Sequence, residues 1–289
     1  MSADQRARAR FMCHISTRPD AAQWGELRLS AGAVVIGFRG GAISPVPHRG
    51  VIRNLSRRSR HRLMVALAGV EWPEGEYALV TLTYPGVFPA DPEAWRRHLD
   101  AFRHRWERRW GPAEGAWVLE FQRRGAPHWH LVLRLPAMRI ELLRRWVSVA
   151  WYVVVGSGDR RHLAAGTNVR RADSPRGAAQ YLFAELGKWK QKQLPVGLGG
   201  AGRWWGIWRL KRRVVREDVS PSEFFVLRRL LRRLALSRGY RSVGGRLEGL
   251  TVLAGRRARP WALARAIAGW LDSLRGTGTA GPRLSVSAV

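Results

Sequence analysis

Hydrophobic residues recur every three or four positions in several segments of the chain, which is the spacing of an apolar helix face. In the clearest segment, Asp91 can cap a helix and Pro92 can occupy its first position. Trp95, Leu99 and Phe102 then follow on one face. The pattern predicts helices at about residues 56–70, 91–111, 138–155, 174–190, 220–237 and 260–274.

Apolar and polar residues alternate in other segments that are rich in β-formers, which predicts strands. These segments are residues 77–83, 116–122, 128–135 and 167–171, and a short loop at residues 123–127 joins the second and third as a hairpin.

The segments of predicted structure divide the chain into three parts. Residues 1–50 mix Arg with Gly, Ala and Pro without a sustained period, so we expect a loosely ordered basic N-terminal arm. Residues 51–210 form a mixed core of helices and strands, and residues 211–289 an Arg-rich helical C-terminal region.

The charge of the chain points to a polyanionic partner. Its 289 residues are 46% hydrophobic, as in globular proteins, but 51 Lys and Arg face only 21 Asp and Glu, a net charge of +30. No apolar run approaches the roughly 20 residues that span a bilayer, so nucleic acid is the expected partner and no membrane is involved. No apolar segment of a signal peptide follows the N-terminus, so we expect a cytoplasmic protein. A single cysteine excludes an internal disulfide and a CxxC zinc site.

Only four of the basic residues are lysines, and all lie in one short segment: Lys188, Lys190, Lys192 and Lys211. Chance clustering is one interpretation. The other is that this segment requires a compact amine rather than the broad, planar guanidinium of arginine.

The clearest candidate for chemistry is the pair His128 and His130, with Trp129 between them. Side chains alternate along a strand, so both imidazoles share one face and Trp129 faces the core. Two histidines on one face make half of a divalent-metal site, and the hairpin can bring Glu120 beside them as a third ligand. Alternatively, the histidines form hydrogen bonds in a polar surface pocket and Glu120 pairs with an arginine of the hairpin loop.

The predicted helix at residues 174–190 places a second set of reactive groups on one face. Tyr181 and Lys188 are two turns apart, and Glu185 lies between them. Lys188 can lean toward the helix N-terminus and reach the space in front of Tyr181. The alternative is a half-buried tyrosine and a solvated lysine with no shared role.

Four motifs occur in an order that resembles the rolling-circle replication initiators of plasmids and phages, which are HUH endonucleases. The motifs are TLTYP at residues 81–85, GAPHWHL at 125–131, the segment 181–188 and GRWWG at 202–206, and the resemblance covers roughly residues 50–210.

This resemblance implies an α+β fold with a central antiparallel sheet of about five strands flanked by helices. To that core we add the helical basic C-terminal extension. It also implies that Mg²⁺ or Mn²⁺ is bound by His128, His130 and Glu120, and that Tyr181 is the nucleophile. Lys188 matches the lysine that follows the nucleophile, and we expect it to bind the scissile phosphate.

Glu185 departs from those family members that have two catalytic tyrosines, because the second tyrosine is expected at this position. Strand transfer between two tyrosines is therefore in doubt. Glu185 can instead activate water, or the tyrosine of a second subunit, at termination. Alternatively, it is an exposed carboxylate that pairs with Lys188.

The expected activity is metal-dependent nicking and joining of single-stranded or origin DNA through a 5′-phosphotyrosine. Bases are expected to stack on aromatic residues near arginines, although any one tryptophan can belong to the core instead. The expected DNA-binding residues are Arg123, Arg124, Lys190, Lys192, Arg203, Trp204 and Trp205.

The wider setting and the competing functions follow from the same residues. No GxxxxGK[ST] motif is present, so a host helicase must unwind the DNA, and a host polymerase can extend the free 3′ end. The expected location is the cytoplasm of a prokaryotic or phage-infected cell. The alternatives are an HUH transposase or relaxase and, in another class, a DNA-binding protein without catalysis.

Overall fold

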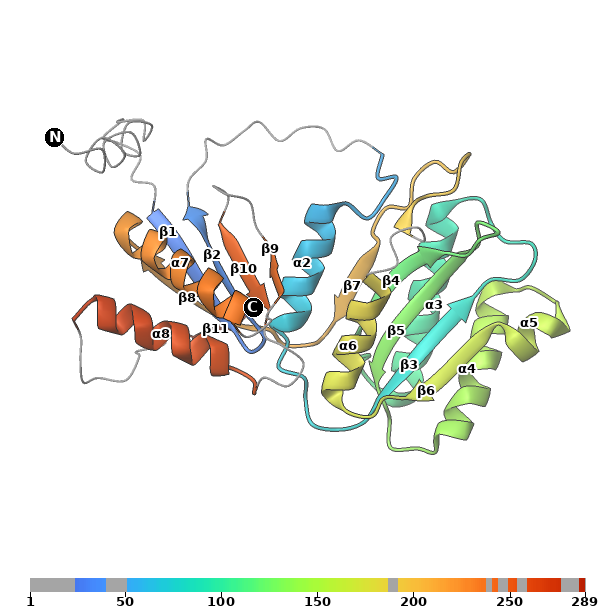
Figure 1. The fold of residues 1–289 in the computed structure, drawn as a ribbon. Helices are drawn as coiled ribbons and strands as arrows, with labels where there is room; N and C mark the ends of the chain where they lie inside the picture. The colour runs from blue at the N-terminus through green and yellow to red at the C-terminus, as the bar shows by residue number, and fades with distance from the viewer. Residues whose placement is uncertain are drawn as a thin grey trace.

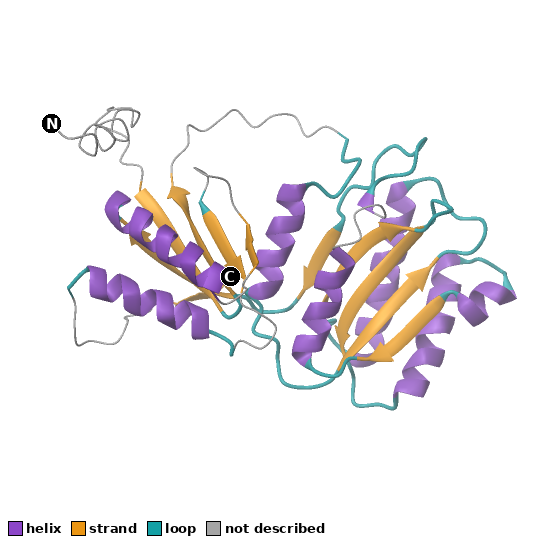
Figure 2. Ribbon diagram, in the orientation of Figure 1, coloured by secondary structure: helices purple, strands orange, loops and turns teal. Residues whose placement is uncertain are grey.

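The computed structural model describes residues 24–39, 51–186, 192–237, 241–243, 249–253, 259–276 and 286–288. These residues form two antiparallel sheets, each with helices packed against it (Figures 1 and 2). The predicted α+β class is confirmed.

One sheet has five strands and contains the residues of interest. In spatial order the strands are β6 (Thr167–Arg171), β3 (Tyr77–Thr83), β5 (Pro127–Arg134), β4 (Gly115–Phe121) and β7 (Trp205–Trp208). All neighbouring pairs are antiparallel. The five-stranded antiparallel sheet that the resemblance implied is therefore present.

The β4–β5 hairpin forms as the sequence predicted. Gly125 adopts a positive φ of 80° in the loop, a conformation that glycine tolerates without a Cβ penalty. The Gln122 amide donates to Ala126 at 3.0 Å and closes the turn. This turn pairs Glu120 with His128 and thereby fixes which residues of the two strands share a face.

Helices cover both faces of the five-stranded sheet. Helices α3 (Pro92–Trp110), α4 (Ile140–Val155) and α5 (Arg160–Ala165) lie behind it in Figure 1, and α6 (Pro175–Leu186) lies in front, over β3, β4 and β5. Helix α2 (Arg57–Ala68) packs beside α6.

The core behind the sheet is aromatic, and the predicted helix start holds it in place. Trp129 is fully buried and meets Trp117 edge to face at 5.2 Å between ring centroids. Trp95 of α3 packs on Phe121 at 5.6 Å. The carboxylate of Asp91 accepts from the first amides of α3, as predicted, and caps of this kind contribute about 1 kcal/mol.

The second sheet has six strands and draws on both ends of the chain. In spatial order the strands are β11 (Val286–Ala288), β8 (Arg213–Val219), β1 (Trp24–Ser30), β2 (Ala33–Arg39), β10 (Leu250–Leu253) and β9 (Arg241–Val243). Helices α7 (Pro221–Ser237) and α8 (Ala262–Leu274) cover one face of this sheet and bury Leu27, Ile36 and Phe224 among other apolar residues.

This second sheet corrects two expectations. Residues 24–39, expected to be part of a loosely ordered arm, form the β1–β2 hairpin. The region 211–289 contains α7 and α8, as predicted, but also strands that were not predicted. The alternating apolar residues of β1 and β2 become buried only when β8 and β10, far along the chain, pair with them. Among the described residues, no helix has the length and apolar character needed to cross a membrane.

Candidate metal centre and nucleophile

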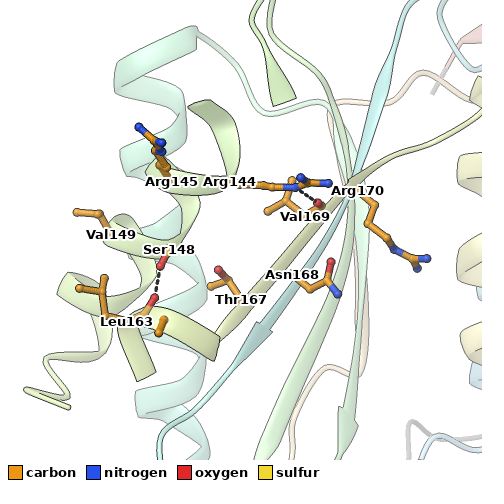
Figure 3. A pocket seen from close by; sticks show the side chains of 10 residues that line it. Arg144, Arg145, Ser148, Val149, Leu163, Thr167, Asn168, Val169 and Arg170 are labelled. Atoms are coloured by element: carbon orange, nitrogen blue, oxygen red, sulfur yellow. Dashed lines mark hydrogen bonds between the residues drawn. The ribbon is translucent and has the colours of Figure 1, made fainter. Parts of the chain in front are cut away.

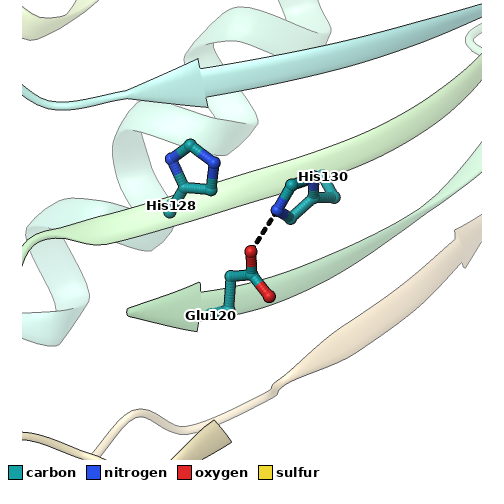
Figure 4. A group of neighbouring side chains, drawn as sticks. All are labelled: Glu120, His128 and His130. Atoms are coloured by element: carbon teal, nitrogen blue, oxygen red, sulfur yellow. Dashed lines mark hydrogen bonds and ion pairs between the residues drawn. The ribbon is translucent and has the colours of Figure 1, made fainter. Parts of the chain in front are cut away.

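Glu120, His128 and His130 meet on the face of the sheet that α6 covers (Figure 4). Glu120 lies directly opposite His128 in the β4–β5 ladder, and His130 is two residues further along β5. One ligand atom from each residue lies within 4.8 Å of the others. An ion held at about 2.1 Å by each of two ligands sets those ligand atoms about 3–4 Å apart, so a small inward movement completes the site.

The donor set fits a divalent transition ion. Imidazole nitrogens suit such ions, whereas Mg²⁺ prefers oxygen ligands. The Nδ1 atom of His128 lies 2.9 Å from the Thr83 hydroxyl, a contact that orients the ring. In the tautomer with its hydrogen on Nδ1, the Nε2 atom carries the lone pair that a cation needs.

Glu120 is held as a charged carboxylate in a buried position. It is 3% exposed, and burial alone raises its pKa. The hydrogen bond with His130 Nε2 and the charge of Lys192 outweigh burial and lower the pKa of Glu120 to about 2. The carboxylate is therefore ionised, as a metal ligand must be.

Lys192 is part of this site rather than of an outer DNA-binding surface, which corrects the sequence-based expectation. Its side chain is 0% exposed, and its Nζ donates to Glu120 Oε2 at 2.7 Å. The segment before α2 fixes its backbone, because the Leu55 amide donates to the Lys192 carbonyl at 3.1 Å. A phosphate of bound DNA has no access to a side chain buried in this way.

Tyr181 of α6 faces the same group. Its hydroxyl lies 2.6 Å from His130 Nδ1, and the side chain is half-buried. Burial and the charge of Glu185 raise the pKa of Tyr181, although a hydrogen bond with Thr81 and the charge of Arg170 act in the opposite direction. The phenol is therefore protonated at neutral pH and must lose its proton before it can act as a nucleophile.

Glu185 lies one helical turn after Tyr181 and also faces His130. Its side chain is 5% exposed, and Oε2 lies 3.4 Å from His130 Nε2. The alternative of an exposed helix carboxylate is therefore wrong. Its proposed partner in that alternative, Lys188, lies outside the described residues, as does Lys190.

The structure separates the two neighbouring tryptophans expected in a DNA-stacking groove. Trp204 is 3% exposed and packs on Phe121 in the core, so it cannot stack on a base. Trp205 is half-buried, and its Nε1 donates to Ser59 at 3.0 Å. The expected stacking groove is therefore wrong for Trp204.

The three predicted DNA-binding arginines lie on the surface. Arg203 and Arg123 are exposed. Arg124 is exposed as well, but its guanidinium donates to the carbonyl oxygens of Tyr84 and Pro85 and so fastens the hairpin loop to the end of β3.

Comparison with known proteins supports part of the sequence-based interpretation. Residues 77–190 match the family model of the Replication-associated protein ORF2. This segment contains β3 to β6 and α6, and with them the metal-binding candidates, Tyr181 and Glu185. No curated protein and no solved structure matches the chain. The match supports a relationship of this part of the chain to replication initiators, and its Glu-His-His group is a possible metal site.

Proposed function

We propose that this protein nicks and joins single-stranded DNA with the help of a divalent metal, and thereby initiates rolling-circle replication of a plasmid or phage. One observation carries the proposal. The hydroxyl of Tyr181 lies 2.6 Å from His130, a member of the Glu-His-His group, so a nucleophile and a metal site share one small volume. The matched family of replication-associated proteins supports the same activity.

Glu120, His128 and His130 would hold the cation, and its donor set favours Mn²⁺ over Mg²⁺. A bound cation withdraws negative charge from the scissile phosphate and orients it. With His130 Nε2 directed at the cation, the ring carries its hydrogen on Nδ1 and donates it to the Tyr181 oxygen. This hydrogen bond favours the phenolate, which lowers the cost of removing the proton from a phenol of raised pKa.

The reaction exchanges one phosphoester for another. The Tyr181 oxygen forms a bond to phosphorus, the bond from phosphorus to the 3′ oxygen breaks, and that oxygen takes up a proton. The products are a 5′-phosphotyrosine and a free 3′-hydroxyl. Because the phosphoester is kept, a 3′-hydroxyl can later reverse the reaction without ATP, and a host polymerase can meanwhile extend the free end.

Glu185 would act in the second half of the cycle. Its buried carboxylate lies one turn from Tyr181, where family members with two tyrosines carry the second one. In this position it can accept a proton from water, or from the tyrosine of a second subunit, when the covalent intermediate is resolved.

Two other functions remain as alternatives. An HUH transposase or relaxase uses the same metal group and nucleophile, but the matched family of replication-associated proteins favours an initiator. A DNA-binding protein without catalysis would keep the basic surface and lack the covalent step.

The test is incubation of the full chain with a labelled single-stranded oligonucleotide and Mn²⁺. We expect a covalent adduct that peptide mapping places on Tyr181. The adduct should be lost in Tyr181→Phe and His128→Ala and retained in Tyr152→Phe, a control in α4 on the other side of the sheet. An adduct that persists in Tyr181→Phe, or binding without any adduct in the wild type, would contradict the proposal.

A further inference from the structure

An open pocket of about 710 Å³ lies at the edge of the five-stranded sheet, beside the metal-binding candidates rather than over them (Figure 3). Its wall is formed by α4, α5 and the edge strand β6. Arg144 and Arg145 of α4 and Arg170 of β6 contribute three positive charges, and no acidic residue lines the pocket.

The three arginines are available to an anion. All three are exposed, and among the described residues none of them takes part in an ion pair with a carboxylate. The Nε atom of Arg144 donates to the Val169 carbonyl at 2.8 Å, which holds this guanidinium at the sheet edge. A guanidinium held in place loses less conformational entropy when it binds a phosphate.

The strand register connects this pocket to the candidate metal centre. His130 pairs with Thr81, and Thr81 pairs with Asn168 of the edge strand. Paired residues of an antiparallel sheet share a face, so Asn168 and Arg170, two residues later, lie on the face that carries His130. Two strand spacings separate His130 from Asn168, a distance of about 10 Å.

Electrostatics supports the same connection. Arg170 acts on Tyr181 strongly enough to oppose the rise of the Tyr181 pKa. Helix α6 packs over β3, β4 and β5, and the exposed residues Asn168 and Arg170 lie beyond β3 at the sheet edge. A strand of DNA can therefore cross β6 between the metal-binding candidates and the pocket.

We propose that this pocket binds the segment of single-stranded DNA next to the scissile phosphate. Arg144 and Arg145 contact backbone phosphates, while Asn168 and Arg170 line the path from the metal centre. The proposal rests on the proposed nicking activity for the place of the scissile phosphate. The pocket is larger than a single phosphate requires, and Val149 and Leu163 add apolar surface for a sugar or base.

The test compares the double variant Arg144→Gln/Arg145→Gln with a matched pair, Arg108→Gln/Arg109→Gln, in the last turn of α3. Both are made in the Tyr181→Phe background, so that binding is measured without cleavage. Fluorescence anisotropy gives the Kd for a single-stranded oligonucleotide as a function of salt. Loss of two phosphate contacts should reduce the salt slope by about 1.4 and weaken binding by ~25-fold at about 0.1 M salt relative to 1 M.

Unchanged thermal unfolding of the variant, and recovery of affinity in Arg144→Lys/Arg145→Lys, would show that the loss concerns charge rather than folding. Unchanged affinity and salt slope in the Gln pair would overturn the proposal, as would an equal loss in the α3 pair or a loss confined to RNA of the same sequence. The adduct assay is read separately. A wild type that forms no adduct, together with a weakened Gln pair, would end the nicking hypothesis and support the pocket.

Discussion

Replacing Lys192 with Met tests how far the site depends on one buried ion pair. The substitution keeps an unbranched side chain of similar length and removes the ammonium from Glu120, which is 3% exposed. Breaking a buried pair by removing one partner costs about 3–5 kcal/mol, because the other charge stays buried without compensation. His130 contacts the second carboxylate oxygen and can take up a proton, so we expect a loss near 3 kcal/mol in free energy of unfolding.

The assay is urea unfolding of the metal-free protein, with Lys211→Met as the control because that lysine is exposed. We expect the control to change stability by less than about 0.5 kcal/mol. The double variant Glu120→Gln/Lys192→Met should be more stable than Lys192→Met alone, because it no longer buries an uncompensated charge. Added Mn²⁺ should stabilise Lys192→Met more than the wild type, because the cation supplies the missing positive charge.

Two results would refute this reasoning. One is a Lys192→Met variant as stable as the Lys211→Met control. The other is a double variant that is no more stable than Lys192→Met, because the cost would then come from lost packing and not from the charge of Glu120.

Three further predictions address other parts of the molecule. Gly115→Ala would push a Cβ into the backbone of β5, so urea unfolding should show a loss of about 1–3 kcal/mol, whereas Gly86→Ala, which has open space, should lose little. The hydrogen bond from Arg275 lowers the pKa of Glu223, so its contribution to stability is present above the unfolded-state pKa and disappears as pH falls through the folded one. Glu223→Gln should therefore unfold more easily near pH 7 and lose less stability below about pH 4; an unchanged acid profile would contradict this. Glu185→Gln should still form the covalent adduct but release it more slowly, and unaltered cleavage and release would remove its proposed role.

Local sequence signals were enough to predict the central part of the site. The loop around Gly125 specifies a hairpin, and a hairpin with alternating side chains brings Glu120 beside His128 and His130. The helix with Asp91 as its cap was also predictable, because caps and helical periodicity depend on neighbouring residues. These features need no information from distant parts of the chain.

Features that depend on distant residues were not predictable in this way. The partner of Lys192 lies 72 positions earlier in the chain, and no local pattern distinguishes a buried lysine from an exposed one. The clustering of the lysines was the only signal. Trp204 lies beside Arg203 in the sequence, yet its ring packs on a distant strand. The β1–β2 hairpin shows alternating Leu27 and Leu29, but its neighbours come from the last third of the chain.

The six-stranded sheet has a consequence for biosynthesis. Its first hairpin leaves the ribosome early, whereas β8 and β10 follow only after residues 77–208, which contain all strands of the other sheet, have been translated. Chains fold progressively from the N-terminus as they are made. The sheet that carries His128 and His130 can therefore close as a nascent unit, while the early hairpin waits with unpaired edges for its partners. A ribosome that stalls beyond residue 208 would present the complete catalytic sheet without the lobe that joins the two ends of the chain.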